Sequence, residues 1–333
     1  MKKITMADVA QMAQVSKSTV SQYLNQRYEY MGEDTRKRIE EAIATLGYRP
    51  NILARSLKQK KTSTIGVIVA NILHAFSTQV IRAIEDVCSE ADINVIVCNA
   101  DDNPEKEKKY IEMLRAKQVD GLIVFPTGSN LELYESMDRE KYPLIFVDRI
   151  VNGINIPSVL LNNETASEMA VEHLYSKGYR KIAMLTTSLE RNITPRVERL
   201  EGYKKALEKR LLPLNPAYFK GVEVSEMQKV LEEMFNLPDP PEALLAGNDL
   251  TLLEVLKFVK NNEMSIPKDV ALISIDEVSF SEIYEPSLTV ISQPAFEMGK
   301  YAAENLLEQI RSNEKTDPIH VRFLPNIIVR KST

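Results

Sequence analysis

The sequence contains few of the residues that form disulfides or bind metals. Its 333 residues include two cysteines and three histidines. Cys88 and Cys98 stand outside any CxxC pattern in apolar or helical surroundings, so we expect buried free thiols and no disulfide framework. The histidines are scattered, without the spacing of metal ligands or of a catalytic triad: His74, His173 and His320. We therefore expect neither a metal site nor a cofactor.

Long apolar runs and phosphate-binding loops are also absent. No run of about 18 apolar residues occurs, and the first residues lack the apolar segment of a signal peptide. We expect a cytoplasmic protein with no membrane partner, which argues against an exported sugar-binding protein. Neither GxGxxG opening a helix nor GxxxxGK[ST] is present, which argues against an enzyme on a doubly wound fold.

Charge is divided unevenly along the chain. The whole sequence has a net charge of −5, but residues 1–61 hold 12 Lys/Arg against 6 Asp/Glu, a net of +6. The remainder therefore carries −11. A small basic segment before a large acidic body indicates that the first part faces a polyanion and the rest does not.

The basic segment begins with two short helical patterns, TMADVAQMAQVSKSTVSQYLN at residues 5–25. Thr5 is suited to cap the first helix and Ser16 the second. In the second pattern Val20 is one of the apolar residues on the inner face, and three polar side chains point the other way: Lys17, Ser18 and Gln22. Two short helices joined by about three residues form a helix-turn-helix.

After these two helices the sequence pattern changes twice. A third helix is predicted from about Glu33 to Leu46, with Gly47 as its left-handed cap. From Thr64 onward, short β-branched runs alternate with amphipathic helices, and we expect strands at 65–70, 95–98, 121–125, 144–147, 182–186, 243–246 and 270–275. Continuous apolar strands separated by helices are typical of parallel sheets covered on both faces. We expect two α/β subdomains with a ligand cleft between them.

Several motifs, which follow one another in a fixed order along the chain, resemble those of a known family. They are DVAQMAQVSKSTVSQYLN, TRKRIEEAIATLGYRPNILARSL, TIGVIVANI, VDRIVNG, HLYSKGYRKIAML, RLEGY, LLAGND and the QPAFEMG segment at 293–299. Over essentially the whole chain the sequence resembles the LacI/GalR family of bacterial transcription regulators. Around STVSQYLNQRYEYMGE and ILHAFSTQVIRAIEDV it also resembles the regulators of 2-keto-3-deoxygluconate use.

The resemblance implies a DNA-binding headpiece followed by an α/β core. The headpiece, an all-α helix-turn-helix domain, would span residues 1–49, and a DNA-ordered hinge helix with its linker would span 50–63. Residues 64–333 would form an effector-binding and dimerisation core similar to type I periplasmic binding proteins. Its two subdomains would be roughly 64–161 with 292–323, and 162–291 with the C-terminal end.

The resemblance also assigns residues to DNA. Lys17, Ser18 and Gln22 match the family positions that read base edges in the major groove. Many members carry Arg where this chain has Gln22, so an adenine contact is expected there. Phosphate contacts or helix caps are expected from Ser16, Thr19, Ser21, Asn25 and Tyr48. Gln14 replaces the glycine common in this turn, so some backbone strain is expected.

The octamer at residues 51–58 corresponds to the hinge helix. Its minor-groove residues would be Ala54, Arg55, Leu57 and Lys58, with Leu57 as the apolar wedge. A solvated linker turn is the alternative. One headpiece contacts too few bases for specificity, so we expect a homodimer on a pseudo-palindromic double-stranded operator.

Six positions match the family's cleft residues: Phe76, Asp148, Arg199, Asn248, Asp276 and Gln293. Arg149 and Arg196 are added to this effector-binding set by their position beside them. These side chains suit the hydroxyls and the apolar face of a sugar. Local alternatives exist: Asp276 as a turn cap, Arg149 as a surface charge, and Arg196 paired with Glu198 or Glu201.

A cluster of Arg191, Arg196 and Arg199 bears on the ligand class. It lies around the start of a helix that Thr194 is predicted to cap and Pro195 to open. Such a cluster favours a carboxylate or phosphate, so we expect a sugar acid as effector of a repressor of carbohydrate-use genes. A neutral sugar, a purine or a phosphorylated protein partner are alternatives. The sequence leaves open whether the effector releases or promotes DNA binding.

Overall fold

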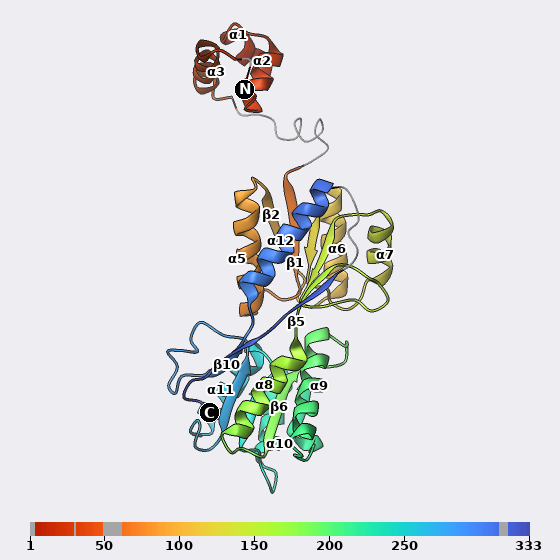
Figure 1. The fold of residues 1–333 in the computed structure, drawn as a ribbon, viewed down its shortest axis with the longest axis vertical. Coiled ribbons are helices and arrows are strands. Elements are labelled where there is room, and N and C mark those ends of the chain that lie inside the picture. Colours follow the sequence, from red (N-terminus) through yellow and green to blue (C-terminus); the bar gives the residue numbers. More distant parts are fainter. Residues whose placement is uncertain (1–3, 30, 49–61, 313–318) are drawn as a thin grey trace. The chain divides into compact units, whose positions relative to one another are not determined.

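A computed structural model describes residues 4–29, 31–48, 62–312 and 319–333 (Figure 1). These residues form two compact units that divide between Thr62 and Ser63. The four hinge positions predicted to enter the minor groove lie outside the described residues: Ala54, Arg55, Leu57 and Lys58. None of the helices in the described ranges is long and apolar enough to cross a membrane.

The first unit is a three-helix domain. Its helices are α1 (Met6–Met12), α2 (Lys17–Leu24) and α3 (Glu33–Leu46). Ser16 caps α2 by accepting a hydrogen bond from the backbone N–H of Thr19 at 3.1 Å, as predicted. Gly47 ends α3 with φ 60°, and Gln14 has φ 52° in the turn between α1 and α2. A non-glycine residue therefore does occupy the left-handed region in this turn.

The second unit contains two six-stranded sheets (Figure 1). The first has the order β11-β5-β4-β3-β1-β2. Its strands are β1 (Thr64–Val69), β2 (Asn94–Asn99), β3 (Leu122–Val124), β4 (Leu144–Val147), β5 (Ser158–Leu161) and β11 (His320–Phe323). All the strand pairs of this sheet are parallel.

The second sheet has the order β12-β10-β9-β8-β6-β7. Its strands are β6 (Ile182–Thr187), β7 (Phe219–Val222), β8 (Ala243–Ala246), β9 (Ala271–Ile275), β10 (Thr289–Ser292) and β12 (Asn326–Ile328). Only the edge pair β10–β12 is antiparallel among the described strands of this sheet.

Helices cover both faces of each sheet, as the continuous apolar strands predict. On the first sheet α5 (Ala75–Glu90) and α12 (Ala295–Ser312) share one core, and α6 (Pro104–Ala116) and α7 (Leu131–Arg139) share the other. On the second sheet α8 (Asn163–Ser176) and α9 (Thr194–Lys209) cover one face, and α10 (Met227–Phe235) and α11 (Asp249–Asn261) the other. Two short 3-10 turns, η1 (Pro216–Tyr218) and η2 (Val224–Glu226), flank β7.

The chain passes between the two sheets three times. The connections run from β5 to α8, from β10 to α12 and from β11 to β12. Each follows the last residue of a strand, so the carboxyl ends of strands from both sheets come to the boundary between the subdomains. This arrangement places ligand-binding side chains where α/β folds usually carry them.

One local prediction is wrong. Thr194 is not the cap of α9: Ile193 is the N-cap, and Thr194 and Pro195 occupy the first helical turn. The Thr194 hydroxyl accepts a hydrogen bond from the backbone N–H of Ile150 at 3.1 Å. Its partner is therefore the segment after β4 rather than its own helix.

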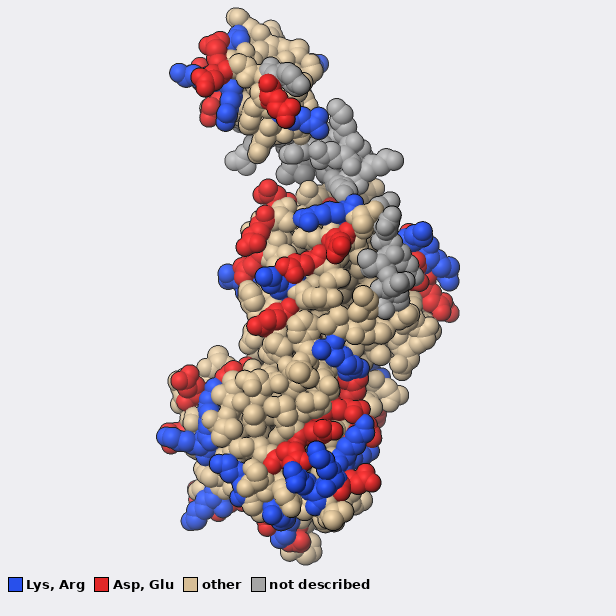
Figure 2. Space-filling view, viewed as in Figure 1, with Lys and Arg blue, Asp and Glu red and all other residues tan. Residues whose placement is uncertain are grey.

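The surface of the second sheet's helices carries balanced charge. Where α8 and α9 lie, Figure 2 shows a band of mixed Lys/Arg and Asp/Glu. Its ion pairs include Lys205–Glu164 at 2.5 Å and Lys204–Glu201 at 2.9 Å. Interleaved signs do not form the single-sign surface that a polyanion would require.

Candidate functional site

The exposed face of α2 carries the residues predicted to read bases. Lys17, Ser18 and Gln22 are exposed, whereas Val20 is fully buried in the headpiece core. The helix therefore presents polar donors and acceptors on a face that packing leaves free. This is the arrangement that a recognition helix needs.

The predicted phosphate contacts have local partners of their own. Ser16 Oγ lies 2.6 Å from Ser18 Oγ and 2.8 Å from Thr19 Oγ1. Asn25 Nδ2 donates to the backbone carbonyl of Ser21 at 2.7 Å. Tyr48 is only 9% exposed and packs in the headpiece core, so a phosphate contact would have to come from its small exposed part.

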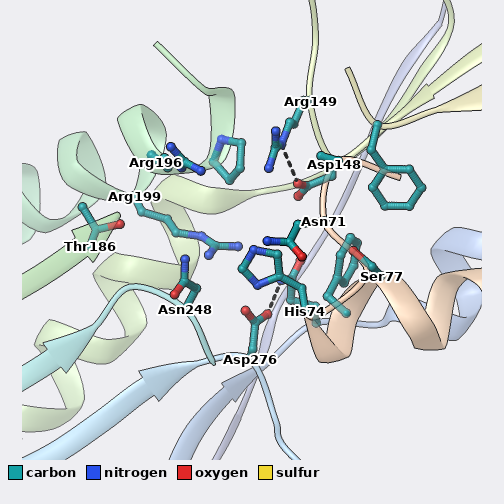
Figure 3. A pocket seen from close by; sticks show the side chains of 15 residues that line it. Asn71, His74, Ser77, Asp148, Arg149, Thr186, Arg196, Arg199, Asn248 and Asp276 are labelled. Atoms are coloured by element: carbon teal, nitrogen blue, oxygen red, sulfur yellow. Dashed lines mark hydrogen bonds and ion pairs between the residues drawn. The ribbon is translucent and has the colours of Figure 1, made fainter. Parts of the chain in front are cut away.

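A cavity lies in the second unit at the carboxyl ends of strands from both sheets (Figure 3). It encloses about 510 Å³ of space, part of it open to solvent. All eight residues predicted to bind an effector line it: Phe76, Asp148, Arg149, Arg196, Arg199, Asn248, Asp276 and Gln293.

Two cavity residues sit in left-handed backbone directly after a strand. Asp148 follows β4 with φ 68°, and Asp276 follows β9 with φ 85°. Asp tolerates this region better than most residues because its short side chain bonds locally. The sharp turns bring both carboxylates to the edge of their sheets, into the cavity (Figure 3).

Arg199 is a buried cation held by neutral groups. Its Nε donates to Asn163 Oδ1 at 2.9 Å and its Nη1 to the Gly247 carbonyl at 2.7 Å. The residue is 5% exposed, and no carboxylate among the described residues forms an ion pair with it. These bonds fix the guanidinium beside Asn248 and Asp276 in Figure 3, where its charge opposes the rise that burial causes in the pKa of the Asp276 carboxyl, without an ion pair being formed.

Asp276 and Gln293 form a polar pair on the same side of the cavity. Gln293 Nε2 donates to Asp276 Oδ1, while Gln293 Oε1 is buried without a partner. Burial raises the pKa of Asp276, although Arg199 and the Gln293 bond oppose this. A ligand hydroxyl would satisfy the free Gln293 oxygen.

Arg149 is buried, so the interpretation as a surface charge is wrong. Its Nη1 donates to Asp102 Oδ1 at 2.6 Å, and its Nε lies 3.5 Å from Asp148 Oδ2. Arg196 Nη1 donates to the Ser188 carbonyl at 2.8 Å, and its Nη2 lies 3.6 Å from Asp102 Oδ2. Arg196 therefore pairs with Asp102 rather than with Glu198, which pairs with Arg322.

These contacts change the pKa values of Arg196 and Asp102. Burial and the neighbouring Arg149 lower the pKa of Arg196 to about 10, against the pull of Asp102. Burial alone would raise the pKa of Asp102, but Arg149 and Arg196 lower it below its usual value. The carboxylate of Asp102 therefore stays charged between the two guanidinium groups.

His74 and Asp249 join the two subdomains beside the cavity. His74 Nδ1 lies 2.5 Å from Asp249 Oδ1, and the backbone N–H of Ala75 donates to Asp249 Oδ2 at 2.7 Å. Burial would lower the pKa of His74, but the Asp249 carboxylate raises it above its usual value. Conversely, burial would raise the pKa of Asp249, and His74 lowers it.

Phe76 and Asn248 each have structural contacts as well. The Phe76 ring meets Phe125 edge to face, with centroids 6.3 Å apart. Asn248 caps α11 by accepting from the Thr251 N–H at 2.9 Å, and its amide nitrogen lies 3.4 Å from Thr187 Oγ1. Both side chains are thus held in place before any ligand arrives.

Several cavity residues were missed from the sequence: Asn71, His74, Ser77, Thr186 and Pro195. Asn71 and Thr186 stand at the carboxyl ends of predicted strands, and this position in the sequence could have identified them. His74 and Ser77 follow the same strand as Asn71. In the described part of the chain no three His, Cys, Asp or Glu side chains form a metal-binding group.

Two family models match different parts of the chain. Residues 5–51 match the model for bacterial regulatory proteins of the lacI family, and residues 171–333 match a periplasmic binding protein-like domain. A helix-turn-helix unit joined to such a domain defines a DNA-binding transcriptional regulator rather than an enzyme. The chain belongs to the lacI family of bacterial regulatory proteins.

Individual relatives cover nearly the whole chain. It is 50% identical over 312 residues to "Probable HTH-type transcriptional regulator EndR" of Paenibacillus polymyxa, covering 93% of this chain and 92% of that protein. It is 33% identical to "HTH-type transcriptional regulator KdgR" of Bacillus subtilis, covering 98% and 97%. A crystal structure of the Lac repressor dimer bound to operator and the anti-inducer ONPF matches with a TM-score of 0.85 at 25% identity, covering 99% of both chains.

Proposed function

We propose that this regulator is a repressor of carbohydrate-use genes and that a small sugar acid, such as 2-keto-3-deoxygluconate, controls its operator binding from the cavity. The observation that carries the ligand class is the buried Arg199. Its hydrogen bonds go to Asn163 and Gly247, which are neutral.

A guanidinium in this state favours an anionic ligand. Burying a cation without a close counter-charge is costly, and a carboxylate from the ligand would relieve that cost through charge-assisted hydrogen bonds. Arg199 is also well placed, because its two bonds to Asn163 and Gly247 hold the guanidinium rigidly. Little side-chain entropy remains to be lost when an acid binds.

The remaining cavity groups suit the hydroxyls of a sugar. Asp148 and Asp276 accept hydrogen bonds, and the unpartnered Gln293 Oε1 is a further acceptor. Phe76 offers an apolar surface for the C–H face of a carbon chain. A polyhydroxylated monocarboxylate therefore uses more of these groups than a purine would.

For DNA binding, the proposal assigns base contacts to Lys17, Ser18 and Gln22. All three are exposed on one helix. Two headpieces are required for adequate specificity, so the active species is a homodimer on a pseudo-palindromic operator. The similar Lac repressor structure is of a dimer bound to operator, which supports this assignment.

The test is thermal unfolding of the full-length protein with a ligand panel. The panel contains 2-keto-3-deoxygluconate, related sugar acids, neutral hexoses and purines, each also measured with Arg199→Ala and Arg199→Lys. A ligand at a hundredfold its dissociation constant stabilises the folded protein by about 2.7 kcal/mol. We expect an acid to stabilise the wild type. This stabilisation should be lost in Arg199→Ala and weakened in Arg199→Lys, because lysine keeps the positive charge but not the planar set of guanidinium donors.

Other outcomes point to other effectors. Stabilisation by neutral sugars or purines alone would show that the acidic-ligand assignment is wrong. If no small molecule stabilises the protein, a phosphorylated protein partner becomes the favoured control, and a pull-down with that class of partner would follow.

A further inference from the structure

The three arginines of the cavity are not equivalent. Arg149 and Arg196 share one carboxylate, that of Asp102, whereas Arg199 has none at ion-pair distance among the described residues. In Figure 3, Arg149 and Arg196 lie together at one end of the cavity, and Arg199 lies nearer Asn248 and Asp276. The cavity thus has an end where the Asp102 carboxylate forms ion pairs with two arginines, and an end where Arg199 lies beside Asp276 without forming an ion pair.

Asp102 uses each carboxylate oxygen for a different arginine. Oδ1 accepts from Arg149 Nη1 at 2.6 Å, and Oδ2 lies 3.6 Å from Arg196 Nη2. The backbone carbonyl of Asp102 also accepts from Arg191 Nη1. Asp102 of the first subdomain therefore contacts Arg149 of its own subdomain and two arginines of the second, Arg191 and Arg196.

The local backbone fixes this carboxylate in place. Asp101 and Asp102 both have φ 52° in the tight turn between β2 and α6. Asn103 then caps α6 by accepting from the Lys106 N–H at 3.1 Å. The left-handed pair turns Asp102 toward the arginines while Asp101 pairs with Lys106 at the surface.

The charges at the two ends follow from these contacts. At the Asp102 end, the guanidinium groups of Arg149 and Arg196 face the carboxylates of Asp102 and Asp148, and a third guanidinium, that of Arg191, donates to the Asp102 carbonyl. At the other end Arg199 faces Asp276, which has no guanidinium at ion-pair distance and whose close partner is the neutral Gln293. Arg199 is therefore the cavity arginine whose guanidinium forms no ion pair with a carboxylate of the described residues.

We propose that Asp102 is a built-in counter-ion that determines ligand specificity: it occupies the anion position between Arg149 and Arg196, directs a ligand's single carboxylate to Arg199, and excludes ligands with an anionic group at each end. The selected class is the monocarboxylate sugar acids, and the excluded class is the dicarboxylate ones. This inference rests on the proposed acidic effector.

The test replaces the charge of Asp102 and keeps its shape. Asp102→Asn preserves the acceptor oxygen and tolerates the left-handed backbone, so the fold should persist. Asp101→Asn is the matched control, because it removes the neighbouring carboxylate at the surface. The probes are gluconate, with one carboxylate, and glucarate, with one at each end, titrated by calorimetry into each full-length protein.

A second readout needs no organic ligand. Sodium sulfate is compared with sodium chloride at equal ionic strength in thermal unfolding of the same proteins. Sulfate should raise the unfolding temperature of Asp102→Asn more than that of the wild type or of Asp101→Asn, since the uncovered arginine pair binds it. Adding Arg196→Gln to Asp102→Asn should abolish the extra rise.

The expected result is a change in preference. The ratio of glucarate to gluconate affinity should rise by about tenfold or more in Asp102→Asn, as one charge-assisted contact is gained. It should not change in Asp101→Asn. An unchanged ratio together with no extra sulfate effect would overturn the proposal, and would show that Asp102 serves only to join the subdomains.

Failure of the proposed function would look different. If neither acid binds to any of the proteins, the acidic effector is wrong, while the sulfate comparison still decides whether Asp102 fills an anion site. If Asp102→Asn does not fold, Asp102→Ser takes its place in both readouts with the same expected directions.

Discussion

Single residues in the cavity divide into charges that have a partner and charges that do not. Arg149 and Arg196 have Asp102, and His74 has Asp249. Arg199 and Asp276 lack a partner of opposite sign at ion-pair distance among the described residues. Buried charges without an ion-pair partner destabilise a protein unless something else offsets them, and this supports the proposed ligand site.

The His74–Asp249 pair makes a prediction about pH. The pKa of His74 is raised, so its contribution to stability is present below about pH 6.5 and is lost as the pH rises through the higher folded value. The pKa of Asp249 is lowered, so its contribution is present above about pH 4 and is lost as the pH falls through the folded value. The pair therefore stabilises most between about pH 4 and 6.5.

Replacing His74 should show the pH range in which the His74–Asp249 pair stabilises the protein. We expect His74→Gln to lose about 1.5–3 kcal/mol at pH 5.5, the contribution of a hydrogen bond to a charged group, and less at pH 9. Other charges near this histidine, Asp276 and Arg149, are present in both proteins. Thermal unfolding at both pH values checks it, with His173→Gln as the control because burial lowers the pKa of that histidine. Equal losses at both pH values would contradict the ion pair.

The structure brings the residues predicted to bind an effector together where a motif fixed their position, and their role in binding stays a prediction. All eight effector positions line one cavity, because each stands near a strand end or in a helix that the family motifs identify. Asp102 and Asp249 were missed. Their importance comes from contacts between the two subdomains, with Arg196 and His74, and no local pattern in the sequence reports such contacts.

At the scale of elements, the sequence predicted best those helices and strands whose ends are marked by a local sequence signal. The third helix runs over Glu33–Leu46 as expected, and Gly47 ends it in left-handed backbone. The strands at 144–147 and 243–246 also match. Five strands were not predicted: β5, β7, β10, β11 and β12. β7, β11 and β12 are edge strands whose residues are exposed or only partly buried, so burial on both faces does not mark them. β5 and β10 are buried inside the sheets, but polar Ser or Thr residues shorten their apolar runs.

One helix pair depends on a single glycine. Gly202 of α9 is buried, and an added Cβ would lie 2.3 Å from the backbone oxygen of Glu164 in α8. Because that atom belongs to a helix backbone, it cannot rotate away. We expect Gly202→Ala to destabilise the second unit by about 1–3 kcal/mol, the usual cost of overpacking.

Thermal unfolding checks the packing of α8 and α9. Glu208→Ala is the control, since Glu208 is exposed on the same helix and the change also introduces alanine there. An unfolding temperature that falls in the control but not in Gly202→Ala would mean that the two helices can separate at little cost.

For the molecule as a whole, the sequence predicted the fold class and the family. The headpiece and the α/β unit divide between Thr62 and Ser63 in the structure. The α/β fold class and the family follow from motifs spread over the whole chain. The ligand could not be predicted as firmly, because its class depends on which arginines are already paired. That depends on three-dimensional contacts such as Asp102 with Arg149.

The proposed control of DNA binding by a ligand requires both units. A ligand shifts operator binding only by its differential affinity for the two states of the regulator. The cavity lies between subdomains joined by Asp102–Arg196 and His74–Asp249 contacts, so a ligand that alters these contacts has a route to differential affinity.

The most direct test is a fluorescence anisotropy titration of the full-length protein onto a pseudo-palindromic operator selected from random DNA. Each titration is run with and without a saturating sugar acid from the thermal panel. We predict that the acid changes operator affinity about 5- to 150-fold, in one direction or the other, as allosteric couplings do. An operator affinity that stays the same at saturating acid would contradict the account.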